Sequence, residues 1–219
     1  MSFSTALSGL NAATRDLSVT GNNIANAGTS GFKALLTHTE ARNVDGPGWH
    51  SRVNGVLQPE TWNAQGGAMQ NTGRDLDIAL AEDRWLAVQT EDGGVAYTRN
   101  GNLHMTANGQ VLDGEGRLVL SDNGPLTLPP HQDLMIAADG TVSLTPLGSE
   151  ATVRAQVGRL SVIDASPAEL KRRADGLFEP TAGTEARPAA GAVMVSGMLE
   201  ASNVNAAEQL VALIEHSRR

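Results

Sequence analysis

The chain has 219 residues, enough for one good-sized domain plus extensions, with 16 basic and 24 acidic residues and a formal net charge of −8. This acidic balance argues against a dedicated binder of nucleic acid or of anionic membranes. The absence of cysteine excludes disulfide bonds, thiolate nucleophiles and cysteine metal sites, and no run approaches the ~18 consecutive apolar residues of a membrane span.

The first predicted element is a helix over residues 3–27. Its seam follows alternating steps of four and three, as in a heptad pattern: Phe3, Leu7, Leu10, Thr14, Leu17, Gly21 and Ile24. Gly28 can end the helix. The other faces carry several asparagines but only two charges, Arg15 and Asp16. A solvated surface helix normally carries more charge, so this one is suited to burial among neighbours.

Residues 37–198 are predicted to be β structure. Turn dipeptides recur at Asp92-Gly93, Asn100-Gly101, Asn108-Gly109, Asp113-Gly114, Asn123-Gly124 and Asp139-Gly140. Short apolar or alternating runs lie between these turns, which is typical of a β domain made of hairpins. The part rich in Gly, Asn and Gln is predicted to be an extended connecting segment, residues 37–74, which leaves 75–198 as the β domain.

A second helix is predicted to begin near Asn203. Asn205 and Glu208 have the spacing of a capping box, immediately before an apolar run. Its seam residues step by three, four and three: Val204, Ala207, Val211 and Ile214. The two helical seams either pair within one monomer or are buried in a multi-chain assembly. We favour the assembly, because one pair of helices has little area to offset its ordering entropy.

No motif requires an active site. The five histidines are scattered, without the spacing of metal ligands: His38, His50, His104, His131 and His216. Asp75 and Asp77 could face the same way on a strand and imitate a catalytic carboxylate pair, which keeps a ligand-binding or hydrolytic β domain as a remote alternative. The basic run 171–173 is predicted to be a solvated turn. We expect no catalytic residue, no cofactor and no metal site.

Three stretches resemble the flagellar basal-body rod and hook family. Residues 22–33 read Asn-Asn-Ile-Ala-Asn-Ala-Gly-Thr-Ser-Gly-Phe-Lys, and the family signature reads Asn-hydrophobic-Ala-Asn, two small residues, Thr, one residue, then Gly-Phe and a basic residue. Residues 197–204, followed by Glu208 and Ile214, look like the family's C-terminal motif. Between them, the runs similar to the shared β domain are 76–80, 85–88 and 97–102.

Within this family, four runs are more similar to the proximal rod member: 124–129, 136–142, 157–160 and 175–178. Residues 1–13 are closer to a hook-type start, so a distal rod or hook-like axial subunit is the alternative. Relatives continue their terminal helix beyond the position that resembles Arg219, so either this chain is a shortened form or its inner helical pairing is incomplete.

The resemblance implies a structural subunit that polymerises into the axial drive shaft and transmits torque. Family members leave the cell through the flagellar type III export apparatus without a cleaved signal. Residues 1–28 lack the basic start and apolar stretch of such a signal, a composition that fits a cytoplasmic protein equally well. The expected partners are copies of the chain, other rod and hook proteins and the export apparatus, with no nucleic acid and no small-molecule substrate.

The resulting fold prediction is mainly β, with a central hairpin-rich domain flanked by terminal helices that pair in the filament. The helices form an inner-tube region of residues 1–36 with 199–219. Subunit assembly is assigned to the seam residues Leu7, Leu10, Leu17, Ile24, Val204, Val211 and Ile214. The junction between helix and β domain is assigned to Asn22, Asn26, Thr29, Gly31 and Phe32.

Overall fold

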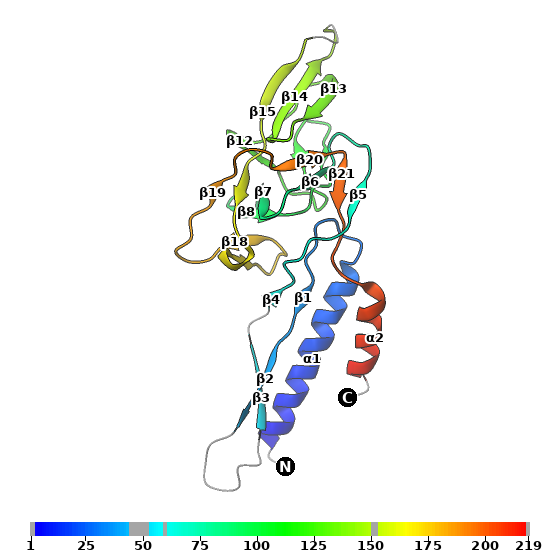
Figure 1. Ribbon diagram of the computed structural model, residues 1–219, viewed down its shortest axis with the longest axis vertical. Coiled ribbons are helices and arrows are strands. Elements are labelled where there is room, and N and C mark those ends of the chain that lie inside the picture. The colour runs from blue at the N-terminus through cyan, green and yellow to red at the C-terminus, as the bar shows by residue number, and fades with distance from the viewer. Residues whose placement is uncertain (1–2, 44–52, 59–60, 150–152, 218–219) are drawn as a thin grey trace. The chain divides into compact units, whose positions relative to one another are not determined.

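The computed structural model describes residues 3–43, 53–58, 61–149 and 153–217 (Figure 1). It divides into two compact units. The first, which we call the helical unit, comprises Met1–Gly28, Lys33–Gln65 and Ser202–Arg219. The second, the β unit, comprises Thr29–Phe32 and Gly66–Ala201. The predicted class, mainly β with a helix towards each end of the chain, is confirmed.

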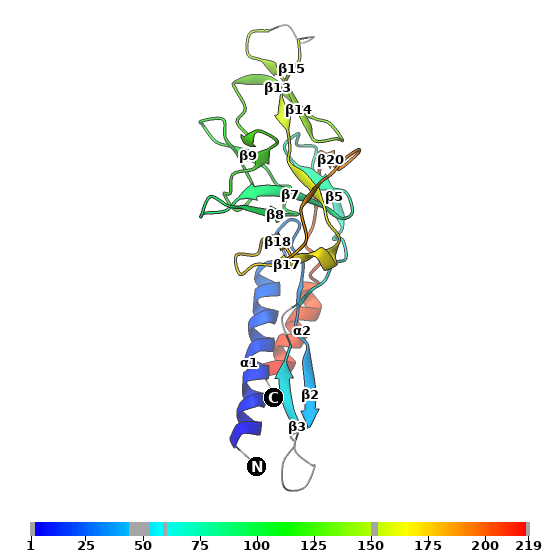
Figure 2. The ribbon, with the colours of Figure 1, turned by 90° about the vertical axis from the view of Figure 1, so that its left-hand side faces the viewer.

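The helical unit is built on α1 (Phe3–Ala25) and α2 (Ala206–Ser217), which lie side by side and run in opposite directions (Figures 1 and 2). Two antiparallel strand pairs complete it: β1 (Leu35–Leu36) with β4 (Thr61–Trp62), and β2 (Thr39–Asn43) with β3 (Val53–Leu57). Helix α1 contacts β1 and β3 as well as α2. The pairing of the two helices within one chain is therefore present in the structure.

The segment 37–74 contains more structure than the extended connection that was predicted. Its strands β2 and β3 pair over five residues, from Thr39 opposite Leu57 to Asn43 opposite Val53. The boundary between the two units falls inside the segment, at Gln65 and Gly66. Strands Thr-Glu-Ala-Arg-Asn and Val-Asn-Gly-Val-Leu lack a regular alternation of apolar and polar residues, so periodicity did not predict them.

Residues 199–201, which were predicted to belong with the helices, lie in the β unit. They form part of β21 (Met198–Glu200), which pairs with β5 (Met69–Asn71), and Ala201 N donates to Ala68 O at 2.8 Å. The strand pairing holds this segment to the β unit.

The β unit is made of antiparallel strand pairs throughout its described residues. A six-stranded sheet has the order β17 (Leu170–Arg172), β18 (Phe178–Pro180), β8 (Val95–Thr98), β7 (Arg84–Gln89), β16 (Val162–Asp164) and β19 (Arg187–Pro188). A three-stranded sheet has the order β13 (His131–Ile136), β14 (Thr141–Pro146) and β15 (Ala155–Arg159).

Short pairs and one turn of helix complete the unit. The pairs are β6 (Ile78–Leu80) with β20 (Met194–Ser196), β9 (His104–Met105) with β10 (Val111–Leu112), and β11 (Leu120–Ser121) with β12 (Gly124–Pro125). The helical turn is η1 (Pro167–Glu169). Hairpins β7–β8, β9–β10 and β13–β14 turn at predicted Asp-Gly or Asn-Gly dipeptides, whose glycines Gly93, Gly109 and Gly140 have positive φ.

The core of the β unit consists of aliphatic side chains from most of these strands. Leu86, Val88, Leu103, Val111 and Val119 have no exposed surface. With aromatic residues at only 3% of the chain, Leu, Val, Ile and Ala must supply the buried area. The many short pairs are held together because they share this one core.

The basic run 171–173 is not the solvated turn that was predicted. Arg172 ends strand β17, and its guanidinium carbon lies 4.7 Å from the centroid of the Phe32 ring. Arg173 pairs with Asp175 at 3.1 Å and with Glu179 at 3.4 Å. The antiparallel return of β18 brings Glu179 back to the run, and Phe32 is distant in the sequence, so the local sequence reveals neither of these two partners.

The predicted cap of the second helix is confirmed. Asn205 Oδ1 accepts hydrogen bonds from Ala207 N at 3.1 Å and Glu208 N at 3.4 Å, and Asn205 Nδ2 donates to Glu208 Oε1 at 2.9 Å. Because the cap fixes the helix start at Ala206, Val204 precedes α2 and is not part of its face. The predicted helical seam was wrong at this residue.

We predict that Asn205→Ala weakens α2 by about 1 kcal/mol, because two N-terminal amides lose their acceptor. Hydrogen exchange of the α2 amides should become faster, and circular dichroism should report a lower helix content. Asn205→Ser keeps a capping oxygen and is the matched control. Equal exchange in the Ala and Ser variants would contradict this role.

Candidate assembly site

The seam residues predicted on α1 divide into exposed and covered groups. Leu7 is 45% exposed and Leu10 is 63% exposed, whereas Leu17 and Ile24 are half-buried. The face of α1 that is buried in the chain carries Val19, Thr20 and Asn23 instead. The N-terminal part of the predicted seam is therefore left open in the single chain.

On α2 the predicted seam lies on the open face. Gln209, Ala212, Leu213 and His216 are half-buried and recur at the three- and four-residue steps of one helix face. Val211 and Ile214 lie elsewhere on the helix and are 58% and 52% exposed, and Leu210 is also exposed. The two helices thus pair through a different face from the predicted one, and several large apolar side chains remain in contact with water.

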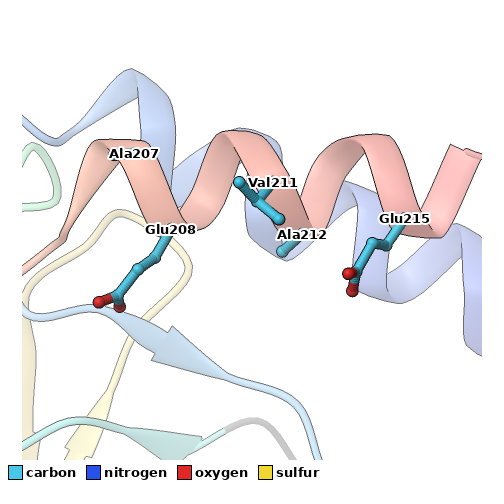
Figure 3. Close-up of a pocket in the computed structure, with 5 residues that line it drawn as sticks. All are labelled: Ala207, Glu208, Val211, Ala212 and Glu215. Carbon is cyan, nitrogen blue, oxygen red and sulfur yellow. The ribbon is translucent and has the colours of Figure 1, made fainter.

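A shallow hollow of about 380 Å³ runs along the open side of α2. It is lined by Ala207, Glu208, Val211, Ala212 and Glu215. Figure 3 shows the carboxylates of Glu208 and Glu215 towards its two ends, with Val211 and Ala212 between them. Alanine side chains leave room beside Val211, so the hollow can receive apolar side chains from another chain, between two negative charges.

Asn22 and Asn26, predicted at the junction, end the first helix. The carbonyl of Asn22 accepts hydrogen bonds from Asn26 N at 3.1 Å and from Asn26 Nδ2 at 2.9 Å. The side chain of Asn22 itself is exposed. Asn26 therefore stabilises the C-terminal turn, while Asn22 contributes its main chain.

Asn23, which was not among the predicted site residues, holds the helical unit together. Only 2% of it is exposed, and its amide bonds both main-chain groups of Leu35: Leu35 N donates to Oδ1 at 2.8 Å, and Nδ2 donates to Leu35 O at 2.9 Å. Nδ2 also donates to Gln209 Oε1 at 3.3 Å. Its position four residues after Val19 puts the two side chains on one face of α1, but that this face is covered follows only from the fold.

Gly31 fits its site only as glycine. Its φ is +69°, and its N–H donates to Glu200 O at 2.7 Å. A Cβ atom on Gly31 would overlap the main-chain carbonyl of Arg99. The neighbouring turn is closed by Phe32 N, which donates to Thr29 O at 3.3 Å. The predicted residues Thr29, Gly31 and Phe32 thus form a tight turn against the β unit.

The turn at Gly31 lies against a buried ion pair that was not among the predicted site residues. Arg99 Nε donates to Glu200 Oε2 at 2.6 Å, and both side chains are buried. Arg99 also donates to the carbonyls of Leu80, Ala81 and Arg84 at 2.9–3.0 Å. Burying two charges is unfavourable unless their remaining hydrogen-bonding groups are satisfied, and here the strand carbonyls satisfy the guanidinium.

The same cluster joins all three stretches that carry the family resemblance. Gly31 comes from the N-terminal stretch, Arg99 from the run 97–102 and Glu200 from the C-terminal stretch. The sequence offered one signal for each charged residue of this pair. Arg99 stands alone after Tyr-Thr and Glu200 stands alone after Met-Leu, each at the end of an apolar strand. Arg99 and Glu200 are about a hundred positions apart in the sequence, so no local pattern links them.

The remote alternative of a carboxylate site gains no support from the geometry. Asp75 is exposed, whereas Asp77 is 1% exposed and its Oδ1 lies 3.4 Å from Arg74 Nη2. Asp75 and Asp77 therefore do not form a paired acid and base.

A hollow of about 330 Å³ adjoins Arg159, but that guanidinium already donates to the carbonyls of Asp139 and Ala189.

The described part of the chain holds no group of three or more His, Asp or Glu residues arranged to bind a metal ion. His50, one of the scattered histidines, lies outside the described residues. Among the described helices, none combines the length and the apolar character needed to cross a membrane.

We predict that Gly31→Ala destabilises the β unit by roughly 3 kcal/mol or more, from positive φ and steric overlap together. Gly73 also has positive φ, at +68°, but has open space around it, so Gly73→Ala should cost only about 1–2 kcal/mol. Gly28→Ala, with neither constraint, should be close to neutral. Urea unfolding measures the loss of unfolding free energy in all three variants. Equal losses at Gly31 and Gly73 would contradict the overlap of the added Cβ with the carbonyl of Arg99.

We expect Asn23→Ala to destabilise the helical unit by about 2–3 kcal/mol, because the N–H and C=O of Leu35 lose their partners. The adjacent exposed residue gives a matched control, Asn22→Ala, with the same change in helix propensity. Faster exchange at the Leu35 amide in the first variant alone would support the assignment. Similar stability of both variants would argue against it.

Comparison with known families matches three parts of the chain. The family described as "Flagella basal body rod protein" matches residues 3–33, and "Flagellar hook protein FlgE/F/G D1 domain" matches residues 79–144. The family described as "Flagellar basal body rod FlgEFG protein C-terminal" matches residues 195–219. The range 3–33 contains the exposed Leu7 and Leu10 as well as Gly31. The range 195–219 contains the exposed Val211 and Ile214 as well as Glu200.

Curated relatives extend over nearly the whole chain. The flagellar basal-body rod protein FlgF of Salmonella typhimurium is 40% identical over 209 residues, covering 92% of this chain and 82% of the relative. The flagellar basal-body rod protein FlgG of Agrobacterium fabrum is 31% identical over 97% of this chain and 88% of the relative. The flagellar hook protein FlgE of Salmonella typhimurium is 33% identical, but over 72% of this chain and 38% of the relative. The extent and order of these matches show that the chain belongs to the flagellar basal-body rod protein family.

Proposed function

We propose that this protein is a structural subunit of the flagellar basal-body rod that polymerises through the open faces of its two helices and has no catalytic role. The carrying observation is the exposed apolar seam of Leu7, Leu10, Val211 and Ile214 in a member of this family. Large exposed apolar side chains grouped on elements of one unit mark an interaction surface.

The chemistry of the helices supports burial against other subunits. Among the residues of α1, only Arg15 and Asp16 are charged. Burying each exposed Leu, Val or Ile of the seam would contribute ~1.5–3 kcal/mol per side chain at most. Repeated at every subunit contact, this burial would favour assembly, although α1 and α2 already pair within the chain.

The partners that we propose are copies of this chain and other axial proteins of the rod and hook. A rod is an open assembly, in which a subunit meets its neighbours through different patches. The hollow along α2 and the exposed leucines of α1 supply two such patches on one unit. On the basis of the family resemblance, we also propose that the chain is exported by the flagellar type III apparatus and that it transmits torque along the rod.

The proximal rod type is favoured over the distal rod or hook-like alternative. Identity is 40% to the FlgF relative against 31% to the FlgG relative. The match to the hook relative covers 38% of that protein, so most of its length has no counterpart here. No observation favours a ligand-binding or hydrolytic β domain.

We predict that Leu10→Asp or Val211→Asp abolishes incorporation into the rod and swimming, because a charge replaces an exposed apolar contact needed only in the assembly. The single chain should keep its stability, since both residues are largely exposed. Complementation of a deletion strain, with mass spectrometry of purified basal bodies, measures incorporation. Circular dichroism and urea unfolding measure the fold.

The matched control is Leu147→Asp, which changes a side chain 69% exposed in the β unit. This variant should be incorporated normally if the helical faces carry assembly. Normal swimming in the Leu10 and Val211 variants would overturn the proposed surface. Absence of the unaltered protein from basal bodies would overturn the structural role itself.

A further inference from the structure

The two units carry very different net charges. Of the 16 basic and 24 acidic residues of the chain, the helical unit holds six of each, so its formal net charge is zero. The β unit holds the other ten basic and eighteen acidic residues, and with them the whole net charge of −8. The unit with the open apolar helix faces is therefore neutral, and the unit with the closed core is strongly acidic.

The basic side chains of the β unit are largely occupied within it. Seven of the ten, all of them arginines, lie within 3.4 Å of a carboxylate oxygen of the same unit. Arg159 donates to two carbonyls, and Arg172 lies over the ring of Phe32. Opposite charges this close cancel one another at longer range, so the ion pairs contribute little to the field outside the unit.

Carboxylates without such partners remain on several separate turns. Six exposed ones form neither an ion pair nor a side-chain hydrogen bond with any described residue: Asp75, Glu82, Glu91, Asp92, Asp122 and Glu185. Glu82 precedes β7, residues 91–92 lie between β7 and β8, and Asp122 lies between β11 and β12. Spread over different turns, these side chains give the unit a diffuse negative charge and not a cation site.

Open apolar faces and a like charge act in opposite directions on two free copies of the chain. Exposed apolar side chains such as Leu10 and Val211 favour association only at contact. Like charges repel over the Debye length, which is about 30 Å in 10 mM salt and about 8 Å in 150 mM salt. A net charge far from zero keeps proteins soluble and monomeric through this repulsion. In dilute salt the repulsion therefore reaches well beyond contact distance.

We propose that the unpaired carboxylates of the β unit hold free copies of this chain apart, so that association through the helical faces tightens as ionic strength rises. The inference rests on the proposed rod function, which assigns those faces to assembly. An interface held by salt bridges would show the opposite sign, because salt weakens the attraction between opposite charges. Charge on the β unit opposes association without adding net charge to the unit that carries the assembly surface.

Sedimentation velocity of the purified full-length chain tests the sign, at one protein concentration in about 10 mM and about 150 mM NaCl. The association constant of the copies should be about tenfold higher at the higher salt concentration, because screening removes most of the repulsion between two bodies of charge −8. Association that weakens with salt would overturn the proposal. A chain that stays monomeric at both salt concentrations would overturn it as well.

A quadruple variant tests whether the β unit is the source of the repulsion: Glu82→Gln, Glu91→Gln, Asp92→Asn and Asp122→Asn. Halving the net charge leaves about a quarter of the repulsion, which depends on the product of the two charges. The variant should associate about five- to tenfold more tightly than the unaltered chain at the lower salt concentration, and equally at the higher one. Urea unfolding should be unchanged, because these carboxylates have no partners. Equal association at the lower salt concentration would contradict the proposal.

The matched control restores charge at other exposed turn positions. Asn108→Asp and Asn123→Asp, introduced into the quadruple variant, keep the size of the side chains and add two negative charges. Association at the lower salt concentration should weaken again. If it does not, individual carboxylates matter and the net charge does not, and the proposal is wrong.

Leu10→Ala in the quadruple variant tests the contact between copies and changes no charge. Leu10 is 63% exposed, so the fold should tolerate the change, and the association constant should fall about tenfold. Unchanged association would show that the copies meet elsewhere and would overturn the proposal. These measurements use free chains. A chain that enters basal bodies but shows no salt dependence would therefore refute this inference alone, whereas absence from basal bodies would refute the rod function.

Discussion

The buried pair of Arg99 and Glu200 is the constraint that holds the segments at Gly31, Gly67 and Glu200 together within the β unit. Arg99 is fixed by three strand carbonyls as well as by Glu200, and Glu200 in turn accepts the amides of Gly31 and Gly67. A buried ion pair contributes little net stability compared with an apolar substitute, but loss of one partner leaves an unpaired buried charge. Its effect here is specificity: segments distant in sequence can meet the β unit in one register only.

Asparagine side chains perform the corresponding role in the helical unit. The amide groups of Asn23 and Asn203 present one donor group and one acceptor, as a peptide group does, and both bond the main chain of short segments that have few strand partners. Helix α1 uses one of its asparagines, Asn23, in this way, whereas Asn11 and Asn22 are exposed. Part of its polar character serves internal bonds, and its exposed leucines remain available to other chains.

The features that the sequence predicted are those with a local physical cause. The helix over residues 3–27, the Asn205 cap and the hairpins at Asp-Gly and Asn-Gly turns each follow from a few neighbouring residues. Which helix face is covered did not follow, because α2 carries apolar residues on both faces, Leu213 on one and Ile214 on the other. Periodicity shows that an apolar face exists but not what covers it.

The weakness of the helical unit is consistent with a protein that completes its packing in an assembly. Helix α2 has 12 residues, a length at which an isolated helix is marginal in water, and in the single chain none of its residues is buried. The β unit, by contrast, has its own core of fully buried aliphatic residues. The β unit can therefore fold on its own core, whereas Leu10, Val211 and Ile214 of the helices stay exposed in the single chain. Burial of the open faces in an assembly would add to a pairing of the two helices that the single chain already has.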